Sequence, residues 1–156
     1  MKIRLEIITD TDSQHEEIVI RCKNDNDTAK TLCRQIEEML YTEPAIIFFK
    51  ENKEFYVDLN DVIFFETEKD VVYAHTIKET YKVKLRLYEL EGILSKDFIR
   101  ISKSAILNVK HIFSIDKNIA SASLVKFYNS HKQVYVSRKY YSSLKIRLNE
   151  RRSYER

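Results

Sequence analysis

A polar break in an apolar stretch is the clearest place for chemistry in this sequence. Phe98, Ile99, Ile101, Ile106, Leu107 and Ile112 are predicted core residues, and a polar interruption between them is formed by Arg100, Ser102, Lys103 and Ser104. Short hydroxyl side chains beside a lysine suit a loop that contacts a phosphate backbone and reaches the edges of bases. An ordinary polar turn is the alternative, and these residues alone do not decide between the two.

A second basic segment comes near the C-terminus. Ser137 can cap a helix, and Arg138 and Lys139 would then occupy its first turn. Cations at that end oppose the helix dipole, at a cost of a few tenths to about 1 kcal/mol. A phosphate bound over the helix N-terminus would satisfy both the dipole and the cations. The pattern therefore indicates a second position for an anion, while Tyr140 and Tyr141 are predicted to pack.

The residues that usually bind metals or perform catalysis have no suitable spacing. The four histidines share no metal-ligand spacing with one another or with Cys22 and Cys33. The chain contains one glycine, so a glycine-rich phosphate loop is excluded. We therefore predict no enzyme activity, no catalytic residue, no metal site, no cofactor and no small-molecule substrate.

Acidic and basic residues are unevenly distributed along the chain. Residues 1–95 contain 13 Lys and Arg against 20 Asp and Glu, whereas residues 96–156 contain 14 against 4. A basic face is typical of proteins that bind a polyanion, because each cation that meets a phosphate releases a counterion. A solvated basic surface remains the alternative.

The first part of the chain predicts a small β-β-α unit over residues 1–43. Lys2–Thr9 and Glu17–Cys22 resemble strands, and a helix is expected to follow Asp27 and to end near Pro44. Its apolar stripe is formed by Leu32, Cys33, Ile36, Met39 and Leu40. Such a small unit buries too little surface to be stable alone. We therefore predict that Leu32, Ile36, Met39 and Leu40 form a homodimer contact, with packing on the rest of the chain as the alternative.

Residues 44–150 predict a second domain that is mostly antiparallel β, because short strand-like runs alternate with hairpin-length connections. The expected strands are Ala45–Lys50, Lys53–Leu59, Val62–Glu66, Val71–Thr76, Thr80–Leu85, Phe98–Ser102, Ala105–Asn108, His111–Asp116, Ser121–Phe127 and Gln133–Val136. Short helices are expected over Leu87–Leu94 and after Ser137, and residues 151–156 are expected to form a frayed tail. The sequence has neither a signal-peptide pattern nor an apolar run long enough to cross a membrane, so we predict a cytoplasmic protein without membrane insertion.

The ordered set of motifs from about Ile46 to Leu148 resembles the LytTR-type DNA-binding domain of bacterial response regulators. Its most specific piece is the segment from Phe98 to Ser104, with Asn108 and Ile112 after it. The remaining matching pieces are Asp61–Glu66, Tyr81–Val83 with Leu87–Leu94, and Val136–Tyr140 with Leu144. The resemblance implies an elongated antiparallel β fold that reads DNA through loops, in a regulator without a receiver domain.

The resemblance also implies where DNA is contacted. The first place is the loop from Thr67 to Asp70, with Lys69 and Asp70; the second is the Ser102-Lys103-Ser104 turn; the third is the Arg138-Lys139 pair. Glu68 and Asp70 are acidic, and they would accept from a cytosine amino group or point away.

We therefore predict a sequence-specific transcriptional regulator whose partner is double-stranded DNA. Affinity is expected from Lys103, Lys110, Arg138 and Lys139, and base-edge contacts are expected from Lys103 and Arg138. The alternative is a protein-interaction module that acts with a membrane-associated partner through its acidic N-terminal region.

Overall fold

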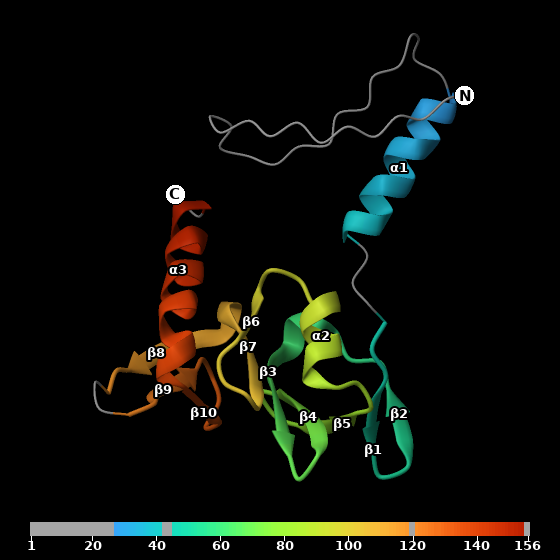
Figure 1. Ribbon diagram of the computed structural model, residues 1–156. Coiled ribbons are helices and arrows are strands. Elements are labelled where there is room, and N and C mark those ends of the chain that lie inside the picture. Colours follow the sequence, from blue (N-terminus) through green and yellow to red (C-terminus); the bar gives the residue numbers. More distant parts are fainter. Residues whose placement is uncertain (1–26, 42–44, 119–120, 155–156) are drawn as a thin grey trace. The chain divides into compact units, whose positions relative to one another are not determined.

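The structure is a computed structural model, and it describes residues 27–41, 45–118 and 121–154. The chain divides into two units, Met1–Thr42 and Glu43–Arg156. In the first unit the described part is helix α1 (Asp27–Tyr41), which confirms the predicted helix (Figure 1). The strands expected at Lys2–Thr9 and Glu17–Cys22 lie outside the described residues.

The second unit contains a seven-stranded sheet in which every neighbouring pair of strands is antiparallel. The strand order is β2-β1-β5-β4-β3-β7-β6. The strands are β1 (Phe48–Lys50), β2 (Lys53–Phe55), β3 (Val62–Glu68), β4 (Val71–Thr76), β5 (Thr80–Val83), β6 (Phe98–Arg100) and β7 (Ala105–Asn108). A short 3-10 helix, η1 (Leu59–Asp61), precedes β3, and helix α2 (Leu87–Ile93) connects β5 to β6. We call this sheet A.

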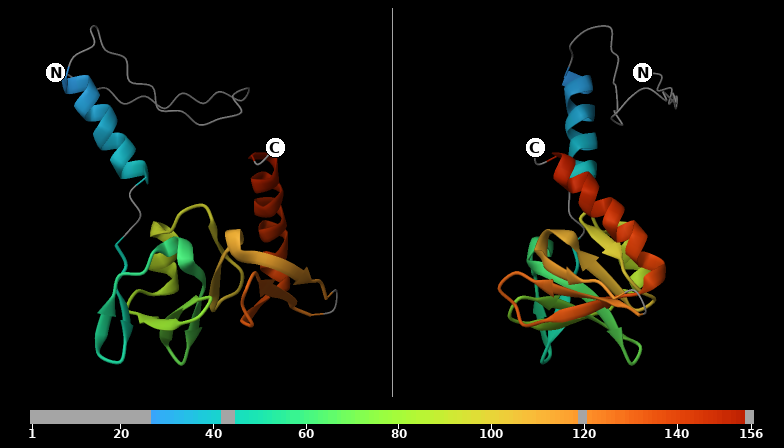
Figure 2. Two further views of the ribbon diagram at one scale, coloured as in Figure 1. Left: turned by 180° about the vertical axis from the view of Figure 1, so that it is seen from behind. Right: turned by 90° about the vertical axis from the view of Figure 1, so that its left-hand side faces the viewer.

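A smaller antiparallel sheet, which we call sheet B, has the order β10-β9-β8. Its strands are β8 (Ile112–Asp116), β9 (Ser123–Phe127) and β10 (Gln133–Val136), and the 3-10 helix η2 (Val109–His111) leads into it. Helix α3 (Arg138–Tyr154) follows β10 and lies with sheet B beside sheet A (Figure 2). The mostly antiparallel β fold predicted from the sequence is confirmed. Helix α3 continues to Tyr154, beyond the domain boundary expected at residue 150.

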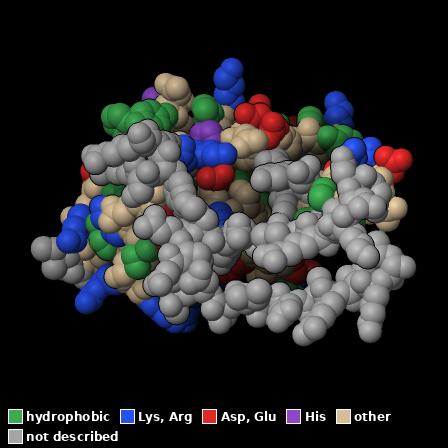
Figure 3. Space-filling view, turned by 90° about the horizontal axis from the view of Figure 1, so that it is seen from above, with side chains coloured by type: hydrophobic (Ala, Val, Ile, Leu, Met, Phe, Trp, Pro, Cys, Tyr) green, Lys and Arg blue, Asp and Glu red, His purple; other side chains and the backbone are tan. Residues whose placement is uncertain are grey.

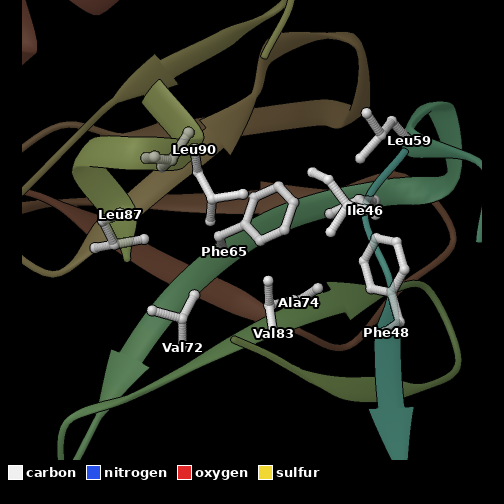
Figure 4. Packing of buried hydrophobic residues seen from close by; sticks show 11 residues of the cluster. Ile46, Phe48, Leu59, Phe65, Val72, Ala74, Val83, Leu87 and Leu90 are labelled. Atoms are coloured by element: carbon white, nitrogen blue, oxygen red, sulfur yellow. The ribbon is translucent and has the colours of Figure 1, made fainter. Parts of the chain in front are cut away.

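Strands β3 and β7 lie between two apolar cores and contribute residues to both. All four residues of β7 and the first four of β3 are buried. The pairing of β3 with β4 shifts register between Val62 and Phe64. As a result Ile63 and Phe64 both belong to the core on the side of sheet B and α3, while Phe65 belongs to the opposite core. That opposite core lies between sheet A and α2, where Leu87 and Leu90 approach Phe65 (Figure 4).

A stack of three rings joins the two sheets. Phe64 of sheet A stacks on Phe127 of sheet B with 5.4 Å between ring centroids, and on its other side it stacks on His75 at 4.1 Å. Burial and the nearby Lys132 ammonium lower the pKa of His75 to about 4, so the ring is neutral near pH 7. The Lys132 ammonium donates to the carbonyl oxygens of Thr76 (2.8 Å) and Glu79 (2.6 Å), which ties the end of sheet B to the β4–β5 turn.

A buried asparagine fixes the end of β7. Asn108 is 1% exposed, and its Nδ2 donates to the carbonyl oxygen of Val62 at 3.0 Å. Its Oδ1 accepts from the backbone N–H of Lys110 at 3.1 Å, which holds the first turn of η2. Both ends of the side-chain amide are therefore satisfied, as a buried polar group requires.

Candidate nucleic-acid interface

Backbone hydrogen bonds join the three segments that the resemblance marked as DNA contacts. The N–H of Thr67, near the end of β3, donates to the carbonyl oxygen of Ser104 at 2.8 Å. The N–H of Ser137, just before α3, donates to the carbonyl oxygen of Ile101 at 2.9 Å. The β3–β4 hairpin and the start of α3 lie on the same, lower side of this unit in Figure 1. Segments that are far apart in the sequence therefore form one continuous surface.

The Ser102-Lys103-Ser104 turn is held by an arginine that precedes it. Nε of Arg100 donates to the carbonyl oxygen of Ser102 at 2.7 Å, and Nη2 donates to that of Lys103 at 2.5 Å. The side chain of Arg100 is 19% exposed and also pairs with Glu91 at 3.2 Å. Within the turn, Ser102 Oγ accepts from the N–H of Ser104 at 3.1 Å. This network fixes the backbone and leaves the Lys103 side chain exposed.

The β3–β4 hairpin turns through two residues with left-handed backbones. Lys69 has φ 46° and Asp70 has φ 67°, and the flanking residues Glu68 and Val71 are paired. Positive φ at both central residues is the type I′ turn, whose twist matches the flanking strands. For a residue such as lysine the left-handed region costs about 1–2 kcal/mol. A strained tip at an exposed position is typical of a binding loop.

Helix α3 begins at Arg138, and its first turn contains no acidic residue. Arg138 and Lys139 are both exposed, and the Lys139 ammonium lies 5.8 Å from the centroid of the Tyr140 ring. The positive end of the helix dipole and two cations therefore face solvent together. This arrangement favours the binding of an anion at the start of α3.

Lys110 lies away from the other predicted contacts. It is in η2, which follows β7, whereas the Ser102-Lys103-Ser104 turn precedes β7. Its ammonium pairs with Asp97 at 2.7 Å and donates to Asn60 Oδ1 at 3.2 Å. The structure thus brings Lys69, Asp70, Ser102, Lys103, Ser104, Arg138 and Lys139 to one surface and does not bring Lys110 there.

Ion pairing neutralises some cations of the second unit but none of four candidate contacts. Carboxylates neutralise Lys50, Arg100, Lys110, Lys126 and Arg147. Across residues 45–118 and 121–154, no ion pair involves the candidate contacts Lys69, Lys103, Arg138 and Lys139. Viewed from above, on the side away from the lower face in Figure 1, Lys and Arg side chains (blue) are scattered over the described residues (Figure 3). The candidate surface therefore keeps its positive charge available to a partner.

Two carboxylates border this surface. Glu66 is the cross-strand partner of Ala105, the residue after Ser104. Burial, together with the nearby charge of Glu68, raises the pKa of Glu66. Its carboxylate oxygens can accept a hydrogen bond from a base amino group.

The described residues provide no support for metal or membrane chemistry. Among them, no group of three or more His, Cys, Asp and Glu side chains could hold a metal ion. None of the described helices is long and apolar enough to cross a membrane.

An antiparallel β domain that presents unpaired cations on neighbouring loops has the features of a DNA-binding domain that works without a recognition helix. The profile of the LytTr DNA-binding domain family matches residues 52–149, which is more than half of the chain. The chain therefore belongs to the LytTR DNA-binding domain family, as the sequence motifs predicted.

Known relatives agree with this assignment. An HTH-type transcriptional regulator of Staphylococcus aureus strain MSSA476 is 33% identical over 138 residues, which cover 87% of this chain and 82% of the relative. The corresponding protein of the bovine strain RF122 is 34% identical over 139 residues, with the same coverage. The solved LytTr DNA-binding domain of a Bacillus cereus response regulator is 29% identical and covers 67% of this chain and 97% of its own length, with a TM-score of 0.62.

The part of this chain that the structure describes does not contain two helices joined by a short turn, because five strands separate α2 from α3. This arrangement favours the loops over a helix as the elements that contact DNA.

The sequence reasoning missed the role of Arg100, which it treated only as part of a polar break. A basic residue two positions before a Ser-Lys-Ser turn is the signal that could have suggested an internal ligand for the turn.

Proposed function

We propose that this chain is a transcriptional regulator that binds double-stranded DNA sequence-specifically through three loops of its β domain. The observation that carries the proposal is the pair of backbone hydrogen bonds that joins the β3–β4 hairpin, the Ser102-Lys103-Ser104 turn and the start of α3. Family membership and the similarity to transcriptional regulators support the same role. The chain would act in the cytoplasm as a binding protein rather than as an enzyme.

Each contact has a distinct role in this proposal. Lys103 and Arg138 reach base edges, because both are exposed, lack ion-pair partners among the described residues and lie on backbones fixed by hydrogen bonds. Lys69 and Lys139 contact phosphates, and Asp70 accepts from a base amino group. The Ser102 and Ser104 hydroxyls, which lie 3.3 Å apart, donate to the backbone of the DNA.

Lys110 would supply a phosphate contact outside the surface formed by the three loops. Its ion pair with Asp97 competes with any phosphate, since one ammonium must divide its donors between the two. Asp97 and Lys110 are both partly exposed, so the pair is weak enough for a duplex to displace it.

We also propose that residues 1–43 form a dimerisation unit separate from the DNA-binding domain at 44–150. In α1, Leu32 and Ile36 lie one helical turn apart and are partly exposed; the side chains of Met39 and Leu40 lie outside the described residues. Two linked DNA-binding domains gain affinity because the second contact becomes intramolecular. Light scattering on the full chain and on Leu32→Asp/Ile36→Asp tests this, because loss of a dimer is expected only in the variant.

The experiment that tests DNA binding starts with selection of duplexes from a random-sequence pool by the full chain. Lys103→Ala is expected to weaken binding to the selected duplex about 5- to 150-fold, corresponding to about 1–3 kcal/mol for a base contact. Lys78→Ala, at an exposed lysine in the β4–β5 turn, is the matched control and should bind normally. If no duplex is enriched and affinity does not fall as salt rises, the proposed function is wrong.

A further inference from the structure

A groove of about 700 Å³ lies on sheet A beside the proposed DNA contacts. Strands β1, β4 and β5 line it, and β1 and β4 contribute the aromatic side chains of Phe49 and Tyr73. The turn residues of the two neighbouring hairpins, Glu51 and Asn52 from β1–β2 and Asp70 from β3–β4, also line it. Of the residues that line this groove, the three-loop proposal uses only Asp70.

Three cations line the groove at alternate positions along one stretch of chain. Lys82 lies in β5, Lys84 and Arg86 follow in the segment between β5 and α2, and all three are exposed residues of the groove lining. The Lys84 ammonium lies 4.3 Å from the centroid of the Phe49 ring, which holds its stem against the sheet. None of the three cations pairs with a carboxylate among residues 45–118 and 121–154.

The groove lining contains fewer acidic residues than basic ones. Glu51 and Asp70 are the acidic residues of the lining, and both belong to the hairpin turns at its end. Lys50 also lines the groove, but Glu79 neutralises it through an ion pair. The balance therefore remains positive along the β5 side, where a negatively charged partner would be attracted.

The groove is continuous with the proposed interface. A row of cross-strand neighbours runs from Ala105 through Glu66 and Tyr73 to Lys82. Because neighbouring strands lie about 4.8 Å apart, the three steps place Lys82 about 14 Å from the residue that follows Ser104. At 3.4 Å per base pair, that distance corresponds to about four base pairs of duplex.

We propose that this groove binds the sugar–phosphate backbone of the DNA that flanks the site read by the three loops. Lys82 and Lys84 each contact a phosphate, and Arg86 extends the same row. Backbone contacts fix the position of a protein on the duplex and carry no base information, so this surface adds affinity rather than specificity. The inference rests on the proposed function, because it assumes that the neighbouring loops bind DNA.

The test compares the full chain with Lys82→Ala/Lys84→Ala on a duplex selected from a random pool, with flanks intact and with the flanks trimmed. Each phosphate contact contributes about 0.9 to the slope of log affinity against log salt. Between 50 mM and 200 mM salt, two contacts therefore make the wild-type affinity fall about tenfold more than that of the variant. Trimming the flanks should remove this difference.

Two control proteins separate the contact from a general charge effect. Lys78→Ala/Lys96→Ala removes two exposed lysines that do not line the groove and should keep the wild-type slope. Lys82→Arg/Lys84→Arg keeps the charges and should restore the slope. Melting curves show whether each variant is folded.

The result distinguishes this inference from the function on which it rests. If the wild-type chain binds no duplex, the proposed function has failed. If the wild type binds but Lys82→Ala/Lys84→Ala keeps its affinity and slope on flanked DNA, the groove inference is wrong and the three-loop function stands. Unchanged DNA binding with loss of regulation in cells, or with loss of self-association, would likewise overturn it and assign the groove to a protein partner or a second copy.

Discussion

Replacing Arg100 with alanine separates positioning of the DNA-reading turn from direct contact with DNA. The guanidinium donates to the carbonyl oxygens of Ser102 and Lys103 and pairs with Glu91, so each of its three nitrogens already donates within the protein. A basic residue beside a DNA-contacting turn would ordinarily be assigned to a phosphate. The structure instead predicts that Arg100 acts through the conformation of the turn.

The expected magnitude follows from what the substitution releases. Three turn residues regain backbone freedom, at about 1 kcal/mol each, but two restraints remain on Ser104: its N–H bond to Ser102 Oγ and its carbonyl bond to Thr67. A net loss of about 1–2 kcal/mol in binding free energy is expected, which is about 5- to 30-fold in affinity. Water can reach the freed carbonyls, so the fold should lose only about 1–2 kcal/mol of stability.

The assay is a salt titration of binding to a selected duplex. Arg100→Ala should lower affinity at every salt concentration while leaving the salt slope unchanged, and Arg100→Lys should rescue little, because an ammonium lacks the planar fork that spans two carbonyls. Arg147→Ala is the matched control, since Arg147 also holds a carbonyl oxygen, that of Lys96, and a carboxylate. A slope lower by about 0.9 in Arg100→Ala would show a lost phosphate contact and refute the positioning role.

Three further outcomes are expected. Asn108→Ala should lower the free energy of unfolding by about 1–3 kcal/mol in urea titrations, because it leaves a buried β3 carbonyl unpaired; a neutral result would contradict the role of the amide. The pKa of His75 is about 4 in the folded chain and near 6.5 when unfolded, so stability is retained above pH 6.5 and falls as the pH drops toward 4. Because solvent screens the partly exposed ring, the expected loss in free energy of unfolding is about 1–2 kcal/mol rather than about 3. His75→Gln should abolish this contribution to the difference in stability between pH 7 and pH 4. Finally, Lys110→Ala should weaken all duplexes alike and lower the salt slope by about 0.9, while Asp97→Asn should strengthen binding; a loss confined to the selected duplex would contradict a phosphate contact.

Three short strands were predictable to the residue. The sequence predicted Val71–Thr76, Ala105–Asn108 and Gln133–Val136, and the structure has the same three strands. Each is bounded by polar residues that form a turn or a 3-10 helix, so local chemistry alone defines the ends. The runs from Ala45 and Lys53 were overestimated, because β-propensity continues past the point where a partner strand ends.

The arrangement of the candidate site could not be predicted from the residues alone. The bond between Thr67 and Ser104 depends on the pairing of β3 with β7, and no local pattern encodes that pairing. The same limit applies to Lys110, because the sequence does not indicate its ion pair with Asp97. The family resemblance supplied the three contact segments, and the sheet supplies the reason why they lie together.

The charge asymmetry predicted the type of partner but not the place where it binds. Three of the four acidic residues in residues 96–156 are paired with cations from the same part of the chain: Asp97, Asp116 and Glu150. Those pairs neutralise basic residues away from the loops. Lys69 joins the surface from the acidic part of the chain, because the β3–β4 hairpin extends to it. The proposed DNA-binding surface is therefore formed by cations that have no acidic partner among the described residues, on segments that backbone hydrogen bonds hold together.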